Sequence, residues 1–194
     1  MWVVLFLVSC GSLVVTGYYG NDEIVGKGRW LVLNNMQCEN PEQYEIPIDI
    51  TRKKLNRTCD AFSIHAHLDK DLDITYGFEL IAKKEVDGGF KFYQKVTDQS
   101  FCEMLKKYTG DNYRQVLAKA KVDPPDCPIP KGEIVVEDHI MDYSELEETG
   151  MYGTFDICMY VTYMMQRVGC MRWLMRFERV NENDDDDDDD DDDY

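Results

Sequence analysis

The chain has 194 residues, 44% of them hydrophobic, and a formal net charge of −17 at pH 7. The run Asp184–Asp193 supplies ten of these charges, so the remainder carries −7. An acidic chain without a basic stripe argues against nucleic-acid binding, because that function requires cations to neutralise phosphates. A block of like charges repels itself and buries nothing, so we expect residues 181–194 to form a disordered tail. A weak contact of this tail with calcium or a basic partner is the alternative to a purely solubilising role.

The first seventeen residues carry no charged side chain. This apolar run is too short to span a bilayer and ends in small or modest residues, which predicts a secretory signal peptide, residues 1–17, cleaved after Gly17. The alternative is a lipoprotein, because Leu7-Val8-Ser9-Cys10 resembles a lipid-attachment box that would anchor the chain through Cys10. No later stretch is apolar enough to span a bilayer. We therefore predict an extracellular protein with no transmembrane segment in the mature chain.

Removal of the signal leaves residues 18–180 as one domain ahead of the tail, long enough to bury a core. An even set of cysteines in a secreted chain predicts disulfides, but spacing alone leaves the connectivity open. The six cysteines are Cys38, Cys59, Cys102, Cys127, Cys158 and Cys170. Asn56-Arg57-Thr58 is a sequon and predicts glycosylation at Asn56 on an exposed position.

Alternation of apolar and polar residues predicts most of the chain to be β-strand. Residues 44–50 alternate around one proline, typical of an edge strand, and 59–68 form a second candidate. The clearest strand is 71–84. Its apolar face contains Leu72, Ile74, Tyr76, Phe78, Leu80 and Ala82. Residues 85–89 supply the glycines that a hairpin turn needs, after which Phe90 and Phe92 are expected on the same inner face.

The period then changes from strand to helix. Residues 98–121 predict a short helical insert with Asp98 as a candidate N-cap and Gly110 as a break between two helices. Cys127-Pro128-Ile129-Pro130 cannot be helical, because two prolines fix φ and remove backbone donors. This segment is expected to lead rigidly into a strand over 133–141.

Two long strands close the chain, over 154–166 and 171–178, with a turn expected at 167–169. One face of the first carries Phe155, Ile157 and Met159, and one face of the second carries Met171, Trp173, Met175 and Phe177. Many short-period segments and only two helices predict an all-β fold. We expect an immunoglobulin-like antiparallel β-sandwich, or a β-cup that surrounds a cavity, with a short helical insert at about 98–121.

His65-Ala66-His67 places two imidazoles on one face of a strand, as a zinc site could require. The sequence offers no third ligand at related spacing, so a polar strand face is expected and no metal. Ser63 lacks a nucleophile elbow or an oxyanion loop, so we expect neither an enzyme nor a cofactor.

The apolar stripe on the last two strands indicates more than a generic core. Six of the ten methionines lie between Met151 and Met175. Methionine is flexible and polarizable, and it is frequent where an apolar surface must adapt to varied ligands. Ordinary core is the alternative for any single member, but the set favours a cavity for a hydrophobic ligand.

Five segments, in order, resemble a known family. They are 85–90 (EVDGGF), 101–105 (FCEML), 127–132 (CPIPKG), 150–157 and 168–171 (VGCM). The chain is similar in these to the ganglioside activator protein and to the activator-like secreted proteins of insects, some of them chemosensory, within the lipid-recognition (ML) superfamily. The resemblance spans roughly residues 36–180. It implies a β-cup for an acyl chain or another hydrophobic molecule, without catalysis.

The resemblance also implies disulfide pairing. In the family, the cysteines at the positions of Cys102 and Cys127 are bonded to each other. The cysteine at the position of Cys170 is bonded to one near the N-terminus, which corresponds here to Cys38. Cys59 and Cys158 are then left for each other. The chain departs from the family in lacking extra cysteines within the helical insert, in Glu133-Ile134 and in the acidic tail, so the family's ligand is not carried over.

The expected function is therefore that of a secreted carrier or presenter of a lipid, fatty-acid or pheromone-like molecule, with a receptor or a membrane surface as a further partner. The predicted lining is Ile74, Tyr76, Phe78, Leu80, Phe92, Phe155, Ile157, Met159, Trp173, Met175 and Phe177. The alternative is a secreted interaction module with a filled core that docks on a receptor or a basic partner.

Overall fold

A computed structural model describes residues 24–56 and 59–180, and the predicted signal peptide and acidic tail lie outside them. The strands are β1 (Val25–Lys27), β2 (Arg29–Met36), β3 (Ile48–Lys54), β4 (Asp60–Leu68), β5 (Tyr76–Val86), β6 (Gly89–Asp98), β7 (Gly132–Ile140), β8 (Thr149–Met151), β9 (Gly153–Tyr163) and β10 (Gln166–Glu178). The helices are α1 (Phe101–Thr109) and α2 (Asn112–Lys119), with 3-10 turns η1 (Pro41–Gln43) and η2 (Tyr143–Glu145).

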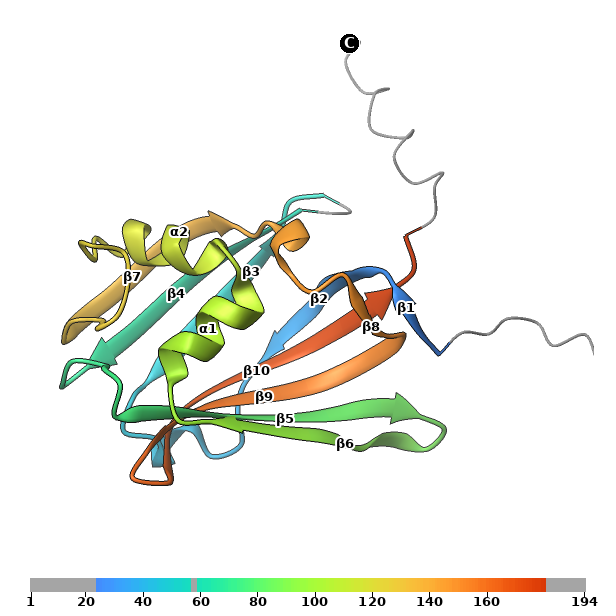
Figure 1. Ribbon diagram of the computed structural model, residues 1–194, viewed down its shortest axis with the longest axis horizontal. Helices are drawn as coiled ribbons and strands as arrows, with labels where there is room; N and C mark the ends of the chain where they lie inside the picture. The colour runs from blue at the N-terminus through green and yellow to red at the C-terminus, as the bar shows by residue number, and fades with distance from the viewer. Residues whose placement is uncertain (1–23, 57–58, 181–194) are drawn as a thin grey trace, which may run out of the picture.

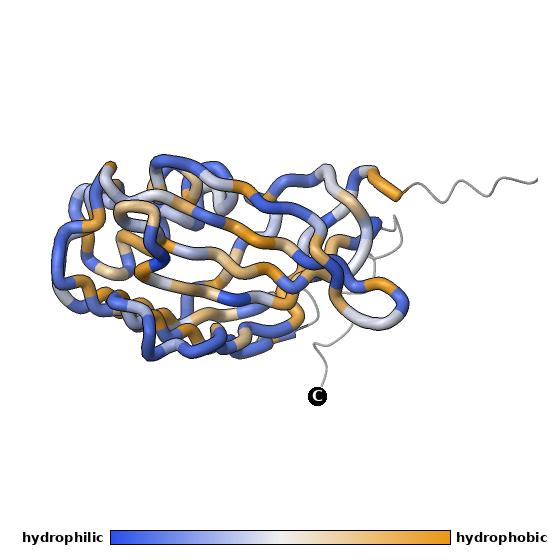
Figure 2. Tube along the Cα trace, turned by 90° about the horizontal axis from the view of Figure 1, so that it is seen from below, coloured by the Kyte–Doolittle hydropathy of each residue, from blue (hydrophilic) through white to orange (hydrophobic). Residues whose placement is uncertain are grey.

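The strands form two main layers, as Figure 1 shows. A five-stranded antiparallel sheet has the order β2-β10-β9-β5-β6, and a three-stranded antiparallel sheet has the order β3-β4-β7. The short pair β1-β8 adds a small third sheet. Hydrophilic and hydrophobic residues alternate along many of the strands (Figure 2), as half-buried strands require. The predicted all-β sandwich with a short helical insert is confirmed. β3 is an edge strand as expected, but it begins at Ile48 and overlaps only the end of the predicted range 44–50.

The core lies against the inner face of the five-stranded sheet in two clusters. The first contains Phe78 and Val161 and extends to Phe101 and Leu117 of the two helices. The second surrounds Phe155 and Phe177 beside β2, where Trp30 contacts both rings. Fully burying one such aromatic side chain contributes roughly 1.5–3 kcal/mol. The two clusters share Leu80 and Met159 as partly buried neighbours, so the large sheet is a continuous support.

The helical insert lies within the predicted range, but its cap differs. Ser100 is the N-cap of α1, because its side chain accepts a hydrogen bond from the Glu103 backbone N–H at 3.2 Å. Asp98 instead accepts from the Ser100 backbone N–H at 2.8 Å and so orients the residue that caps. The sequence therefore placed the cap two residues early, because both side chains can accept such bonds.

Two of the expected disulfides are present, Cys38–Cys170 and Cys102–Cys127. The expected pair Cys59–Cys158 is wrong, because both thiols are free. Cys158 lies on the outer face of the five-stranded sheet, between Ile81 and Arg172 in the ladder. Cys59 directly precedes β4 in the other sheet. The pairings implied by the family resemblance left them for each other, and the topology places them on different sheets.

Ile74 was expected on the inner face of a strand, and this is wrong. It lies in the turn that precedes β5 and is 83% exposed. Asp73 forms this turn by accepting hydrogen bonds from the Thr75 backbone N–H and hydroxyl at 2.9 and 2.6 Å. A short polar side chain that binds the backbone two residues later favours a turn over a strand, so β5 begins only at Tyr76.

Phe92 was also expected inside and is 69% exposed. In the β5–β6 ladder, Ala82 pairs with Gln94 but the next residue, Lys83, pairs with Phe92, so the register shifts by one residue. The extra residue, Tyr93, takes the inward position and contacts Phe155 with a ring-centroid distance of 5.5 Å. A β-bulge reverses the alternation beyond it. Phe92 therefore pairs with Lys83 on the outer face.

The turn between β9 and β10 was expected at 167–169 but lies at Met164 and Met165. Both have positive φ, 49° and 64°, between the paired residues Tyr163 and Gln166. Gly169 instead follows a register shift within β10. The shift leaves Met171, Trp173, Met175 and Phe177 on one face, as predicted from their spacing.

Candidate functional site

A hollow of about 510 Å³ lies beside the edge strand β3. Its walls come from the chain between β2 and β3, from β4, and from β10. The apolar wall contains Met36, Pro41, Tyr44, Ile46, Pro47, Ile48, Ile50, Ala66 and Met171. The polar part contains Asn35, Gln37, Asp49, His65, His67, Glu133 and Arg172. Ligand sites in proteins have volumes of roughly 300–1,000 Å³ and are mostly apolar with a few polar groups. The hollow has this size, and its lining has nine apolar residues beside seven polar ones.

Local sequence explains why the wall stands at this edge. Pro47 cannot donate to a ladder, so regular pairing of β3 begins at Ile48. Directly before Pro47, the Ile46 backbone N–H donates a hydrogen bond to the Val168 carbonyl at 2.7 Å and links this segment to β10. The disulfide Cys38–Cys170 joins the same two segments, and both cysteines line the hollow. The wall is thus fixed to the large sheet at two points.

Polar side chains border the hollow on the outer face of the three-stranded sheet, where His65 pairs with Asp49 and His67 with Glu133, opposite to the face of Ile48 and Ala66. His67 Nδ1 lies 2.6 Å from Glu133 Oε1, and His67 Nε2 lies 3.2 Å from Asp69 Oδ1. His65 Nε2 lies 2.9 Å from Glu137 Oε1. The hydrogen bond to Glu133, followed by that to Asp69, raises the pKa of His67. These carboxylates hold both imidazoles in place on an exposed, acidic rim.

Arg172 is the arginine among the lining residues, and it forms an ion pair with Asp156. Its Nε and Nη2 donate to the two oxygens of Asp156 at 2.9 and 2.7 Å. Asp156 is 4% exposed, and this bidentate pair raises the pKa of Arg172. The arginine therefore neutralises a buried carboxylate and leaves little positive charge for the hollow.

Several side chains that face between the two sheets keep part of their surface exposed. Cross-strand pairing places Ile50 and Ile64 on one face of the small sheet and Leu80, Met159 and Trp173 on the facing side of the large one. All five keep intermediate exposure despite facing inward. The sheets meet where the ring of Trp173 touches that of Phe62, with a centroid distance of 5.6 Å.

The predicted lining residues divide into three groups, and none of them lines the hollow. Ile74 and Phe92 are exposed. The buried group, which is core, is Tyr76, Phe78, Phe155, Ile157 and Phe177. The half-buried group that faces between the sheets is Leu80, Met159, Trp173 and Met175. The alternation at 44–50 did signal Ile46, Ile48 and Ile50, but no local pattern joined them to Met36, Ala66 and Met171.

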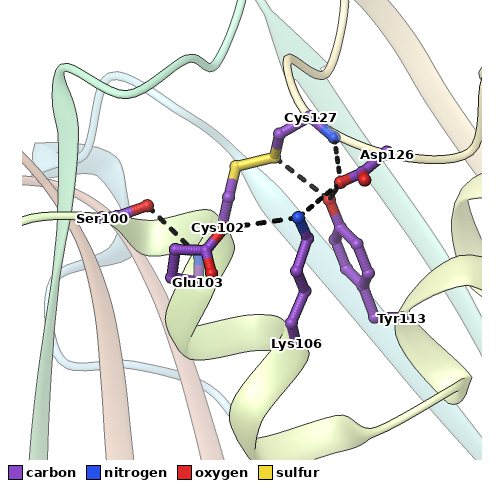
Figure 3. A network of polar contacts seen from close by, with 7 residues as sticks. All are labelled: Ser100, Cys102, Glu103, Lys106, Tyr113, Asp126 and Cys127. Carbon is purple, nitrogen blue, oxygen red and sulfur yellow. Dashed lines mark hydrogen bonds and ion pairs between the residues drawn. A yellow bond between two sulfur atoms is a disulfide. The ribbon is translucent and has the colours of Figure 1, made fainter.

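The helical insert is attached to the Cys127 segment by a polar network (Figure 3). Lys106 of α1 lies 2.8 Å from Asp126 Oδ1 and 3.3 Å from Glu103 Oε1. The Tyr113 hydroxyl of α2 donates to Asp126 at 3.1 Å, and burial chiefly raises its pKa. The Cys127 backbone N–H donates to the same carboxylate at 2.7 Å. With the Cys102–Cys127 disulfide, these bonds hold both helices against the start of β7.

The network predicts an acid-dependent loosening of the insert. The bond from Lys106, followed by that from the Cys127 N–H, lowers the pKa of Asp126 to about 2. Because the folded pKa lies below the unfolded value of about 4, this group stabilises the fold above pH 4 and loses its effect as pH falls toward 2. In Asp126→Asn, the melting temperature should fall less between pH 4 and pH 2 than it does in the wild type. An equally steep profile in Asp126→Asn would contradict this assignment.

Among residues 24–56 and 59–180, no three His, Cys, Asp or Glu side chains are placed to hold a metal ion. No helix within the same ranges is both long and apolar enough to cross a membrane. Asn56 is described, but Arg57 and Thr58 are not, so its glycosylation stays a prediction. Comparison of the chain with family models and with curated proteins gives no match.

Proposed function

We propose that this protein is a secreted, non-enzymatic carrier that binds a hydrophobic small molecule in the hollow beside β3. The observation that carries the proposal is the apolar wall of a space of about 510 Å³. The two disulfides support an oxidising compartment. The resemblance to lipid-recognition proteins in five ordered segments points to the same function.

The energetics of such a site favour an aliphatic ligand. Each methylene moved from water to the wall contributes about 0.8 kcal/mol before entropy costs. A methylene has about the volume of a water molecule in the liquid, ~30 Å³, so the hollow can take a chain of lipid length. Met36 and Met171 provide flexible side chains that adapt to irregular ligands.

The direct test is native mass spectrometry of the secreted, disulfide-intact protein, followed by organic extraction of anything bound. A carrier should retain a lipid of defined mass or take up a fluorescent fatty-alcohol probe with one-to-one stoichiometry. A protein that purifies empty and takes up no such probe is not a carrier.

A single substitution tests where the ligand lies. Ala66→Trp adds a large ring to the inner face of β4, where Ala66 pairs with Ile48 and Ile134, and should reduce probe binding at least about 10-fold by filling the hollow. Thr51→Trp is the matched control, because Thr51 is exposed on β3. Probe titration of both folded variants gives the answer. Equal binding by the two would place the ligand elsewhere.

A second function, docking on a surface, is favoured by an exposed apolar tip made of Ile74, Met164 and Met165. They are 83%, 75% and 98% exposed, the three largest values among the described large hydrophobic residues. The pairing of Tyr76 with Tyr163 brings their two turns to the same end of the large sheet. Positive φ disfavours residues other than glycine and asparagine, so apolar side chains at both turn positions are unusual.

Contact of this tip with a membrane surface can be measured with phosphatidylcholine vesicles. Changing Ile74, Met164 and Met165 together to serine should reduce the fraction that sediments with vesicles at least about fivefold, because about 25 cal/mol per Å² of apolar burial is lost. Ile140→Ser, at a residue 54% exposed on β7, is the control. If the wild-type protein does not sediment with vesicles, a phosphatidylcholine membrane is not the docking partner of the tip.

A further inference from the structure

The polar side chains of the hollow are distributed unevenly in charge. Asp49 and Glu133 line it directly, and Glu137 and Asp69 hold the two histidines of its rim. The positive charge of Arg172 is bound by Asp156. These four carboxylates outnumber the two histidines, so the surroundings of a bound ligand are negative whether or not the imidazoles are protonated.

We propose that the ligand has an apolar chain against the wall formed by Met36, Ile48 and Met171 and a polar end at the rim of Asp49, Glu133 and His67, and that this end donates hydrogen bonds and carries no negative charge. The inference rests on the proposed carrier function and names its ligand class. Long-chain alcohols, sterol-like alcohols and amines have such an end, whereas a free fatty acid does not. This narrows the lipid-like ligands expected from the sequence.

The chemistry of the rim supports this selection in two ways. Ionised carboxylates only accept hydrogen bonds, so a hydroxyl or ammonium group can donate to them and a carboxylate cannot. A carboxylate would also be repelled, because two unit charges at 4 Å interact by about 1 kcal/mol even in water and by more near a protein surface. The side chain of His67 is 47% exposed, so a ligand group can reach its ring or the adjacent Glu133.

The same groups make the selection depend on pH. His67 faces Glu133 of β7 and Asp69 beyond β4, while its neighbour His65 faces Glu137 of β7 and pairs with Asp49 of β3. Protonation of His67 adds a positive charge and a second N–H donor to the rim. Acidification should therefore weaken the discrimination against a carboxylate.

The experiment compares three probes with the same chain, 1-dodecanol, dodecylammonium and laurate, each at concentrations below micelle formation. Displacement of a neutral fluorescent probe from the full chain is measured at pH 7.5 and 5.5. We expect dodecanol and dodecylammonium to bind at least about 10-fold more tightly than laurate at pH 7.5, with a smaller ratio at pH 5.5. The double variant Asp49→Asn, Glu133→Gln should reduce the ratio at pH 7.5, and the distant, exposed Glu85→Gln should not.

Each outcome bears on one of the two proposals. Laurate that binds as tightly as dodecanol at pH 7.5 overturns the inference and leaves the carrier function standing. A preference that the double variant does not change places the polar end away from this rim and also overturns it. Failure of all three probes to displace the reporter, or of the reporter to bind, contradicts the carrier function itself.

Discussion

Replacement of Cys38 and Cys170 together by alanine is expected to lower the free energy of unfolding by about 5 kcal/mol. The two residues are 132 positions apart, so their bond closes most of the chain into one loop and restricts the unfolded ensemble strongly. The change should appear as a lower urea midpoint of unfolding. Because both cysteines also line the hollow, the variant should lose bound probe at temperatures where it is still folded.

Two other pairs of cysteines serve as controls for this result. Cys102 and Cys127 are 25 positions apart, so their joint replacement should cost less, about 3.5 kcal/mol. Serine at both Cys59 and Cys158, which are free, should change the midpoint little. A large loss in this last variant would show that Cys59 and Cys158 are bonded and would contradict the observed topology. Equal losses for the two disulfides would contradict the dependence on loop length.

Alternation along the sequence predicted the faces of regular strands well. Phe78, Phe155 and Phe177 are buried as expected, because the period of two is unbroken in the stretch of strand around each of them. The predictions failed where one residue breaks the period. Phe92 lies beyond a bulge, and Ile74 precedes the true start of its strand. A bulge depends on the partner strand, so the sequence of β6 alone does not reveal it.

The candidate site was harder to predict than the fold. Ile48 and Ile50 had the alternation of an edge strand, but their importance depends on Met171 and Asn35, which only the folded chain brings beside them. Chemical character gave no warning, because His65 and His67 predicted only a polar strand face, and their contacts with carboxylates beside the hollow depend on the fold. The sequence thus predicted which strand faces are apolar, and the topology determines which apolar side chains pack in the core and which line the hollow.

Arg52→Met is expected to destabilise the protein by about 3–5 kcal/mol, because it leaves a carboxylate buried without its cation. Arg52 Nη2 lies 2.7 Å from Asp60 Oδ1, and Arg52 Nη1 donates to the Leu33 carbonyl at 2.7 Å. The Tyr143 hydroxyl donates to the other Asp60 oxygen at 2.6 Å. Asp60 is 2% exposed, so water cannot replace the lost partner. Urea unfolding at pH 7 measures the change.

The loss of stability distinguishes a buried ion pair from one whose cation is exposed to solvent. Lys95→Met also removes a cation, 3.1 Å from Glu79, but Lys95 is 49% exposed and Arg167 remains bound to the same carboxylate, so the loss should be about 0–1 kcal/mol. Removing Asp60 as well, in Arg52→Met with Asp60→Leu, should recover part of the stability lost in Arg52→Met alone, because no unpaired charge is then buried. If the double variant is less stable than Arg52→Met, the pair's attraction is not what holds β3 and β4 to η2, and packing around Phe62 and Tyr143 must account for it.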